Sequence, residues 1–251
     1  MNKIIDAHMH FNMKKENPVD DLINQIELNN IVGGVLILNS DEEKRAFVKS
    51  VSNKVLLNKN IRIATLYDIK KQEDIEFIKY LDGTGIDFLI KLHPRISDIQ
   101  KKDFETYLEG LKKFEKKDII IDGFYYGENL ENHISIEFTI YLATNLNDRN
   151  IVLAHSGGIK ILECMLYTRK IENLYYDLSL TATYLKNSSV YIDIINFLKY
   201  NYKKVFFGSD YPDFTMKEAI DSMMIICKKA ELSEDKIDMV FAENAIKFYK
   251  L

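Results

Sequence analysis

Residues 3–10 read KIIDAHMH, a short apolar run that ends in two histidines one residue apart. Residues 3–7 are typical of a short buried strand, and side chains on a strand alternate between its two faces. Asp6, His8 and His10 are therefore predicted to point the same way, about 6.6 Å from one to the next. Two imidazoles at that separation can bind one metal ion, or they can lie exposed at a strand end.

The same unit, a short apolar run followed by a longer segment of helical period, recurs along the chain. Successive runs begin 23 to 32 residues apart, which is the length of a strand, a helix and two short loops. The runs begin at Ile4, Val35, Ile61, Phe88, Ile119, Ile151, Leu174 and Val205. Apolar residues at i, i+3 and i+4 predict helices within residues 20–30, 41–56, 71–81, 101–117 and 187–204.

Runs that are apolar on both faces suit parallel strands covered by helices. Eight such units in 251 residues predict an α/β fold, the closed (β/α)₈ TIM barrel, with an open doubly wound sheet as the alternative. A further C-terminal helix is predicted from Ser233, a good N-cap residue. The chain has only three prolines and no Pro-, Gly- or Ser-rich linker, so residues 1–251 are predicted to form a single domain.

The composition is that of an ordinary globular protein, with 47% apolar and 29% charged residues. A net charge of −4 argues against nucleic acid or an anionic membrane as a partner. No apolar run is long enough for a signal peptide or a membrane span. We therefore expect a cytoplasmic protein with a small-molecule substrate, with Cys164 and Cys227 as buried reduced thiols. The sequence leaves open whether the chain forms a homo-oligomer.

Four of the five histidines follow predicted strands, at the same end of each. His8 and His10 follow the first, His93 follows the fourth and His155 follows the sixth. Two carboxylates, Asp122 after the fifth strand and Asp210 after the eighth, are placed in the same way. In a barrel these strand ends gather at one mouth, where the chemistry of the fold takes place. This sorting favours a functional site over scattered surface histidines.

Several of these residues have a second interpretation. His93 precedes a proline and can simply begin a turn. Asp210 can cap the last helix, and Asp122 stands in an Asp-Gly pair that is common in turns. Asp177 and Ser179, after the seventh strand, are as compatible with a structural role as with a catalytic one. Tyr125 and Tyr126 are predicted to form walls of the pocket.

At these residues the chain resembles the amidohydrolase superfamily, specifically the amidohydrolase-related branch of metal-dependent hydrolases and decarboxylases. The resemblance runs nearly end to end, and its ordered motifs are DAHMH (6–10), IKLHP (90–94), LAHSGG (153–158), YYDLS (175–179), FFGSDYP (206–212) and ENAIKFYKL (243–251). It implies that His8 and His10 are metal ligands and that Asp210 is a ligand that doubles as general base. It further implies that His155 is a ligand or a catalytic acid beside the metal.

Two positions qualify this resemblance. Relatives usually have a histidine where this chain has Asp122. A carboxylate at this position shifts the metal preference of the site toward harder ions such as Mn²⁺ or Mg²⁺. Alternatively, the aspartate accompanies loss of the metal. Lys91 stands where binuclear relatives such as dihydroorotases use a carbamylated lysine to bridge two metals. The sequence therefore leaves open one ion or two. We expect one divalent ion, Zn²⁺ first, with Asp122 among its ligands.

The predicted function is that of a metal-dependent hydrolase that cleaves a C–N or C–O bond of a small polar, anionic substrate through a metal-activated water. Lys91 and Arg95 offer positive charge to a carboxylate or phosphate, and His93 and Tyr125 are further candidate substrate contacts. A non-hydrolytic, metal-dependent decarboxylase is compatible with the same residues. A metal-free barrel with a binding or regulatory role is the third possibility.

Overall fold

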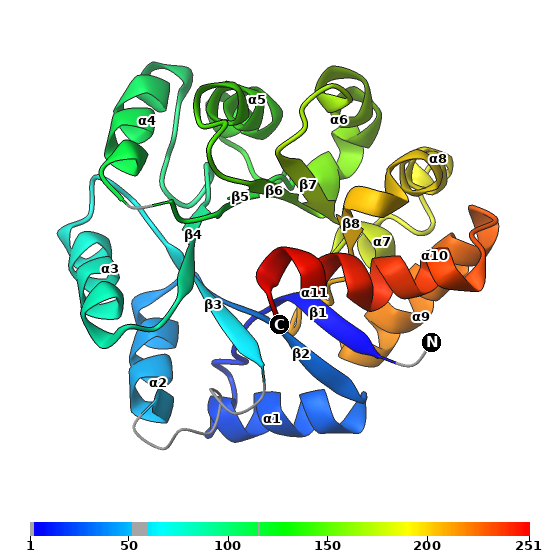
Figure 1. Cartoon of the computed structure of the whole chain (residues 1–251), viewed down its shortest axis with the longest axis horizontal. Coiled ribbons are helices and arrows are strands. Elements are labelled where there is room, and N and C mark those ends of the chain that lie inside the picture. The colour runs from blue at the N-terminus through cyan, green and yellow to red at the C-terminus, as the bar shows by residue number, and fades with distance from the viewer. Residues whose placement is uncertain (1–2, 52–59, 115) are drawn as a thin grey trace.

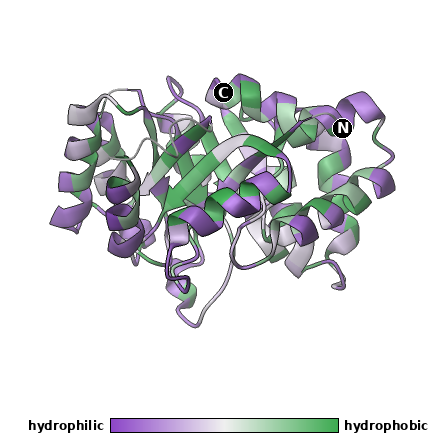
Figure 2. Ribbon diagram, turned by 90° about the horizontal axis from the view of Figure 1, so that it is seen from below, coloured by the Kyte–Doolittle hydropathy of each residue, from purple (hydrophilic) through white to green (hydrophobic). Residues whose placement is uncertain are grey.

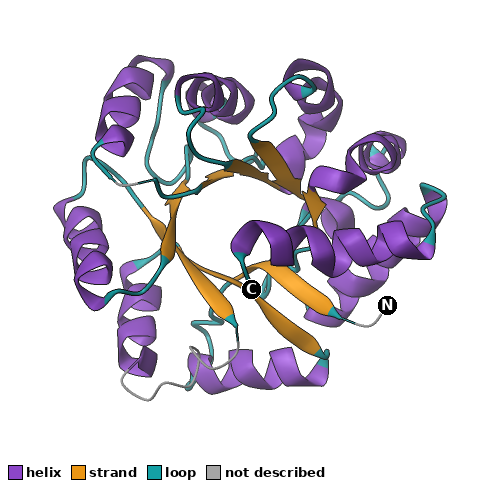
Figure 3. Ribbon diagram, viewed as in Figure 1, coloured by secondary structure: helices purple, strands orange, loops and turns teal. Residues whose placement is uncertain are grey.

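The computed structural model describes residues 3–51, 60–114 and 116–251, and eight of its strands form one parallel sheet in chain order. The sheet curves into a barrel, with the helices as an outer ring (Figures 1 and 3). The predicted (β/α)₈ fold is confirmed. The strands are β1 Ile4–Met9, β2 Ile31–Leu38, β3 Ile61–Leu66, β4 Phe88–Leu92, β5 Ile119–Asp122, β6 Ile151–Ala154, β7 Leu174–Asp177 and β8 Val205–Phe206.

The helices follow the strands much as the periodicity predicts. They are α1 Pro18–Leu28, α2 Asp41–Val51, α3 Gln72–Thr84, α4 Phe104–Lys112, α5 Ser135–Asn145, α6 Ile161–Thr168, α7 Thr181–Tyr184, α8 Tyr191–Asn201, α9 Met216–Lys229, α10 Glu234–Asp238 and α11 Asn244–Tyr249. The part of the second predicted helix at residues 52–56 lies outside the described residues. No helix in the described ranges has the length and apolar character needed to cross a bilayer.

β2 begins four residues earlier than predicted, at Ile31 instead of Val35. The early part of the strand contains Gly33 and Gly34, which sequence patterns associate with turns. Here the glycines permit a close approach to β1, because a Cβ atom on Gly34 would lie 2.1 Å from the carbonyl oxygen of Asp6. The pair therefore belongs to the strand for a steric reason.

The barrel closes between β1 and the chain that follows the short strand β8. The amide of Ala7 donates to the carbonyl of Phe207 at 2.9 Å. The amide of Asp210 donates to the carbonyl of His8 at 2.8 Å, and the amide of His10 donates to that of Tyr211, also at 2.8 Å. These bonds hold Asp210 beside the two histidines of the first strand.

The apolar core has two layers, one inside the barrel and one between the strands and the helices, whose polar faces are outward (Figure 2). The C-terminal helical run, α10, a π-helical turn at Met239–Glu243 and α11, packs Ala245 and Tyr249 against the interior layer. The Arg62 side chain at the start of β3 donates to the Tyr249 carbonyl at 2.8 Å. The predicted extra helix thus covers the amino end of the barrel, and the site lies at the carboxyl end.

Candidate metal centre

A cavity of about 580 Å³ lies at the carboxyl ends of the strands, a volume typical of small-molecule sites. Its polar lining includes most of the residues singled out from the sequence: His8, His10, His93, Arg95, Asp122, His155 and Asp210. Its apolar lining is largely aromatic: Phe11, Phe124, Tyr126, Tyr184 and Phe214. The structure therefore brings the predicted polar residues to one barrel mouth.

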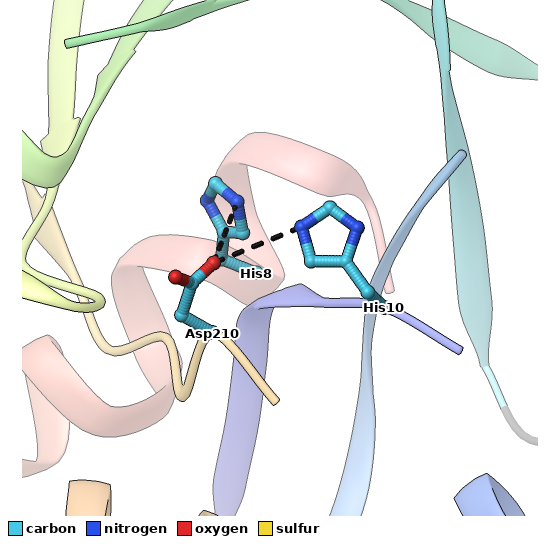
Figure 4. Close-up of side chains that lie close together, drawn as sticks. All are labelled: His8, His10 and Asp210. Atoms are coloured by element: carbon cyan, nitrogen blue, oxygen red, sulfur yellow. Dashed lines mark ion pairs between the residues drawn. The ribbon is translucent and has the colours of Figure 1, made fainter. Parts of the chain in front are cut away.

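His8, His10 and Asp210 form a group of potential metal ligands that all line the cavity. Nε2 of His8 lies 3.3 Å from Oδ1 of Asp210, and Nε2 of His10 lies 3.7 Å from the same oxygen (Figure 4). One donor atom from each of the three residues lies within 4.8 Å of the others. Two imidazole nitrogens and a carboxylate oxygen are a donor set that suits Zn²⁺.

An irregularity in β1 directs His8 into the cavity. Three steps of β1, from Asp6 to Met9, lie opposite two steps of β2, so β1 carries one extra residue. The Asp6 carboxylate does not share the direction predicted for it and does not line the cavity. Its Oδ1 instead accepts hydrogen bonds from the backbone amides of His8 at 3.1 Å and Ser209 at 2.9 Å. Asp6 thus braces the backbone behind His8.

Asp177, whose role the sequence left open, is the partner of His8. Its Oδ2 lies 3.0 Å from Nδ1 of His8, and its Oδ1 accepts from the backbone amide of His155 at 2.9 Å. Burial lowers the pKa of His8 to about 4, which favours the neutral imidazole that binds metals. His8, His155 and Asp177 are a second group with donor atoms within 4.8 Å of one another.

His155 lies on a left-handed turn directly after β6. His155 and Ser156 have φ values of 59° and 50°, and the next two residues are glycines that also have positive φ. Nδ1 of His155 lies 3.0 Å from the carbonyl of Ser179, and Nε2 lies 3.2 Å from Oδ2 of Asp122. Burial would lower the pKa of His155, but the Asp122 and Asp210 carboxylates raise it to about 9.

Asp122 has the turn role that the sequence left open, and its second carboxylate oxygen faces the imidazoles of the site. Its Oδ1 accepts from the backbone amide of Phe124 at 3.3 Å, as in a turn, while Oδ2 faces His155 and lies 3.5 Å from Nε2 of His93. It is not in either group of donor atoms within 4.8 Å. Lys91 is buried beneath the cavity without lining it, 3.8 Å from Oδ2 of Asp122. Metal binding by Asp122 stays a prediction.

Of the four predicted substrate contacts, His93 and Arg95 line the cavity, whereas Lys91 and Tyr125 do not. The Tyr125 hydroxyl accepts a hydrogen bond from the amide of Ile136 at 3.0 Å. This amide lies in the first turn of α5, where it has no partner within the helix. Tyr125 therefore caps a helix, and its neighbour Tyr126 forms the wall, with the Arg95 guanidinium 5.3 Å from its ring centre.

Glu43 lines the cavity as well, although no motif in the sequence predicts it as a site residue. One of its carboxylate oxygens, Oε1, lies 3.3 Å from Nδ1 of His10. The only sequence signal for this residue is the Ser40-x-x-Glu43 spacing of a helix capping box, which does not indicate a site by itself.

The sequence matches no protein-family model and no curated protein. Several solved structures are similar over nearly the whole chain, including the following three. An uncharacterised TIM-barrel protein from Bordetella bronchiseptica has a TM-score of 0.72 at 14% identity, over 99% of this chain and 98% of that one. A TatD-family hydrolase from Entamoeba histolytica has a TM-score of 0.64 at 10% identity, over 100% and 99%.

The third structure is N-isopropylammelide isopropylaminohydrolase from Burkholderia multivorans, with a TM-score of 0.64 at 9% identity, over 99% of this chain and 75% of that one. At these identities the similarity establishes the fold alone. The chain shares the TIM-barrel fold of these proteins.

Proposed function

We propose that this chain is a metal-dependent hydrolase that cleaves a C–N or C–O bond of a small polar, anionic substrate. The observation that carries the proposal is the convergence of His8, His10 and Asp210 at the barrel mouth. Their donor set fits one divalent ion, with Zn²⁺ first and Mn²⁺ or Mg²⁺ as alternatives. The hydrolases among the structures of the same fold support the proposal.

A divalent ion held by His8, His10 and Asp210 would supply a water of lowered pKa and would polarise a substrate carbonyl. Asp210 would accept a proton from the attacking water and pass it to the leaving group. The ring centre of His155 lies 4.7 Å from that of His8, and His155 would donate a proton or hydrogen bond to the developing negative charge. Oδ2 of Asp122 accepts a hydrogen bond from Nε2 of His155 at 3.2 Å, and this bond holds the His155 imidazole in place.

The remaining cavity residues suit a small molecule. Arg95 lies at the wall, where its guanidinium can bind a carboxylate or phosphate in two-point fashion. Phe124 and Tyr184 present aromatic surface that excludes water from the polar floor. We propose such a substrate, not nucleic acid or a membrane, and a cytoplasmic setting that suits the two free cysteines.

Decarboxylation is the second candidate, because Arg95 and His155 together suit a carboxylate substrate that must be bound and then protonated. The test is to purify the protein without chelator and to assay it against small amides, lactones and carboxylic acids. The proposal predicts turnover of an amide or lactone that is lost on chelation and restored by Zn²⁺ or Mn²⁺. Release of CO₂ alone supports the second candidate, and turnover that survives chelation contradicts both.

A further inference from the structure

Glu43 closes a capping box at the start of α2. Its Oε2 accepts hydrogen bonds from the backbone amides of Asn39 and Ser40, at 2.8 and 2.9 Å, and from the Ser40 hydroxyl at 3.0 Å. The Ser40 hydroxyl in turn accepts from the Glu43 amide at 3.2 Å. Capping boxes are usually surface features, but the Glu43 side chain is only 7% exposed.

The other carboxylate oxygen of Glu43 is directed at His10. Oε1 lies 3.3 Å from Nδ1 of His10, and an ionised carboxylate can only accept hydrogen bonds. Nδ1 must therefore carry the proton of the neutral imidazole. The lone pair is then on Nε2, which faces Asp210 in the cavity (Figure 4).

The first turn of α2 is anchored so that this carboxylate cannot turn away. The next residue, Lys44, is buried and forms an ion pair with Asp74 of α3. Oδ2 of Asp74 accepts from the backbone amide of Asp68, which follows β3, at 2.9 Å. Three donors on Oε2 and an ion pair one residue further along thus fix the direction in which Oε1 points.

His8 is held by the same arrangement on a different element. Its Nδ1 faces the Asp177 carboxylate at 3.0 Å, and its Nε2 faces Asp210. In both His8 and His10, Nδ1 therefore faces a buried carboxylate and Nε2 faces the cavity. Carboxylate partners of this kind orient metal-binding histidines and select their tautomer.

We propose that Glu43 is a positioning residue of this centre, which holds His10 as the Nδ1–H tautomer so that Nε2 presents its lone pair to a divalent ion. The identity of the ion rests on the proposed function, whereas the tautomer does not. The same glutamate therefore caps the start of α2 and orients His10, a proposed metal ligand.

Glu43→Gln separates the two roles of this side chain. The amide oxygen can keep the three capping hydrogen bonds, and the amide NH₂ then faces Nδ1 of His10. Since an NH₂ group donates, Nδ1 must accept and the proton moves to Nε2. The matched control is Glu218→Gln in the capping box of α9, where Glu218 Oε2 accepts from the Thr215 amide at 3.1 Å and lies outside the cavity.

Two measurements on the full chain test the proposal. Imidazole nitrogen NMR of the metal-free protein at alkaline pH should show His10 as Nδ1–H in the wild type and as Nε2–H in Glu43→Gln. Zn²⁺ affinity by chelator competition should fall roughly 10–100-fold in Glu43→Gln and stay unchanged in Glu218→Gln. A thermal melt of each variant checks that it is folded before its Zn²⁺ affinity is compared.

An unchanged His10 tautomer in Glu43→Gln, or an unchanged Zn²⁺ affinity, overturns the proposal. If Glu43→Gln does not fold, the wild type still decides, because an Nε2–H tautomer of His10 there contradicts the role of Glu43. A wild-type chain that binds no Zn²⁺ contradicts the proposed function instead, and the tautomer then remains the test of Glu43.

Discussion

Nζ of Lys91 lies 3.8 Å from Oδ2 of Asp122 in the barrel interior and makes no hydrogen bond within the described parts of the chain. The Lys91 side chain is 0% exposed. Burial lowers the pKa of Lys91, and the Asp122 carboxylate opposes that shift. Asp122 is therefore the nearest countercharge of the buried Lys91 ammonium, whether or not it also binds a metal ion.

Asp122→Ala should lower the free energy of unfolding of the metal-free protein by about 3–5 kcal/mol, because it leaves Lys91 buried without a close anion. Adding Lys91→Met should recover much of that loss. Denaturant unfolding of the two single variants and the double variant measures the coupling. Strictly additive effects would show that the two charges do not depend on each other.

Asp122 also bears on the metal preference of the centre. If the carboxylate is a ligand, Asp122→Ala should weaken metal binding, and Asp122→His should restore it with a shift toward Zn²⁺, the softer choice. Bound metal and melting temperature are measured on the same preparations. Reduced stability in both variants with unchanged metal content would assign Asp122 to the turn and to Lys91 alone.

Asp210→Asn should reduce kcat by about 10²–10⁴-fold on an identified substrate, because an amide cannot accept a proton from water. The side chains have nearly the same volume, so the melting temperature should change little. Asp221→Asn on the exposed face of α9 is the matched control and should keep full activity. Activity near that of the wild type in Asp210→Asn would remove the assignment of the general base.

Arg95→Ala should raise KM for an anionic substrate by roughly 10–100-fold, the usual worth of a hydrogen bond to a charged group. kcat should change much less, because the contact is made equally in the ground state and the transition state. Arg45→Ala, at an arginine on α2 that does not line the cavity, is the control. A neutral analogue of the substrate should show no difference between the two variants.

Gly34→Ala should prevent normal folding, because the added Cβ would lie 2.1 Å from the Asp6 carbonyl oxygen and 2.5 Å from the Met9 side chain. Gly83→Ala in α3 has no atom within 4 Å of the new Cβ and should stabilise the protein by about 0.5–1 kcal/mol. Soluble yield and thermal unfolding measure both. A stable Gly34→Ala protein would contradict the close approach of β1 and β2.

Most of the fold could be predicted from sequence because each strand is an apolar run bounded by polar residues, as at Ile61 and Leu174. The start of β2 could not. Gly33 and Gly34 are in the strand because β1 passes close by. The local sequence pattern of a strand does not show which other strand it contacts.

The site divides in the same way. The sorting of His8 and His155 to strand ends predicted the barrel mouth, since strand ends meet there in any barrel. Sequence reasoning missed the partner of His10, because Glu43 looks like an ordinary capping residue until the fold brings the start of α2 to His10. The sequence predicts Tyr125 as a wall of the cavity, but its hydroxyl accepts a hydrogen bond from the Ile136 amide of α5.

The central claim is that His8, His10 and Asp210 hold a divalent ion, and elemental analysis of protein purified without chelator tests it most directly. The wild type should contain about one divalent ion per chain, and a folded variant with asparagine at both His8 and His10 should contain none. A folded wild type without a stoichiometric ion, or a variant that keeps its ion, would contradict the claim.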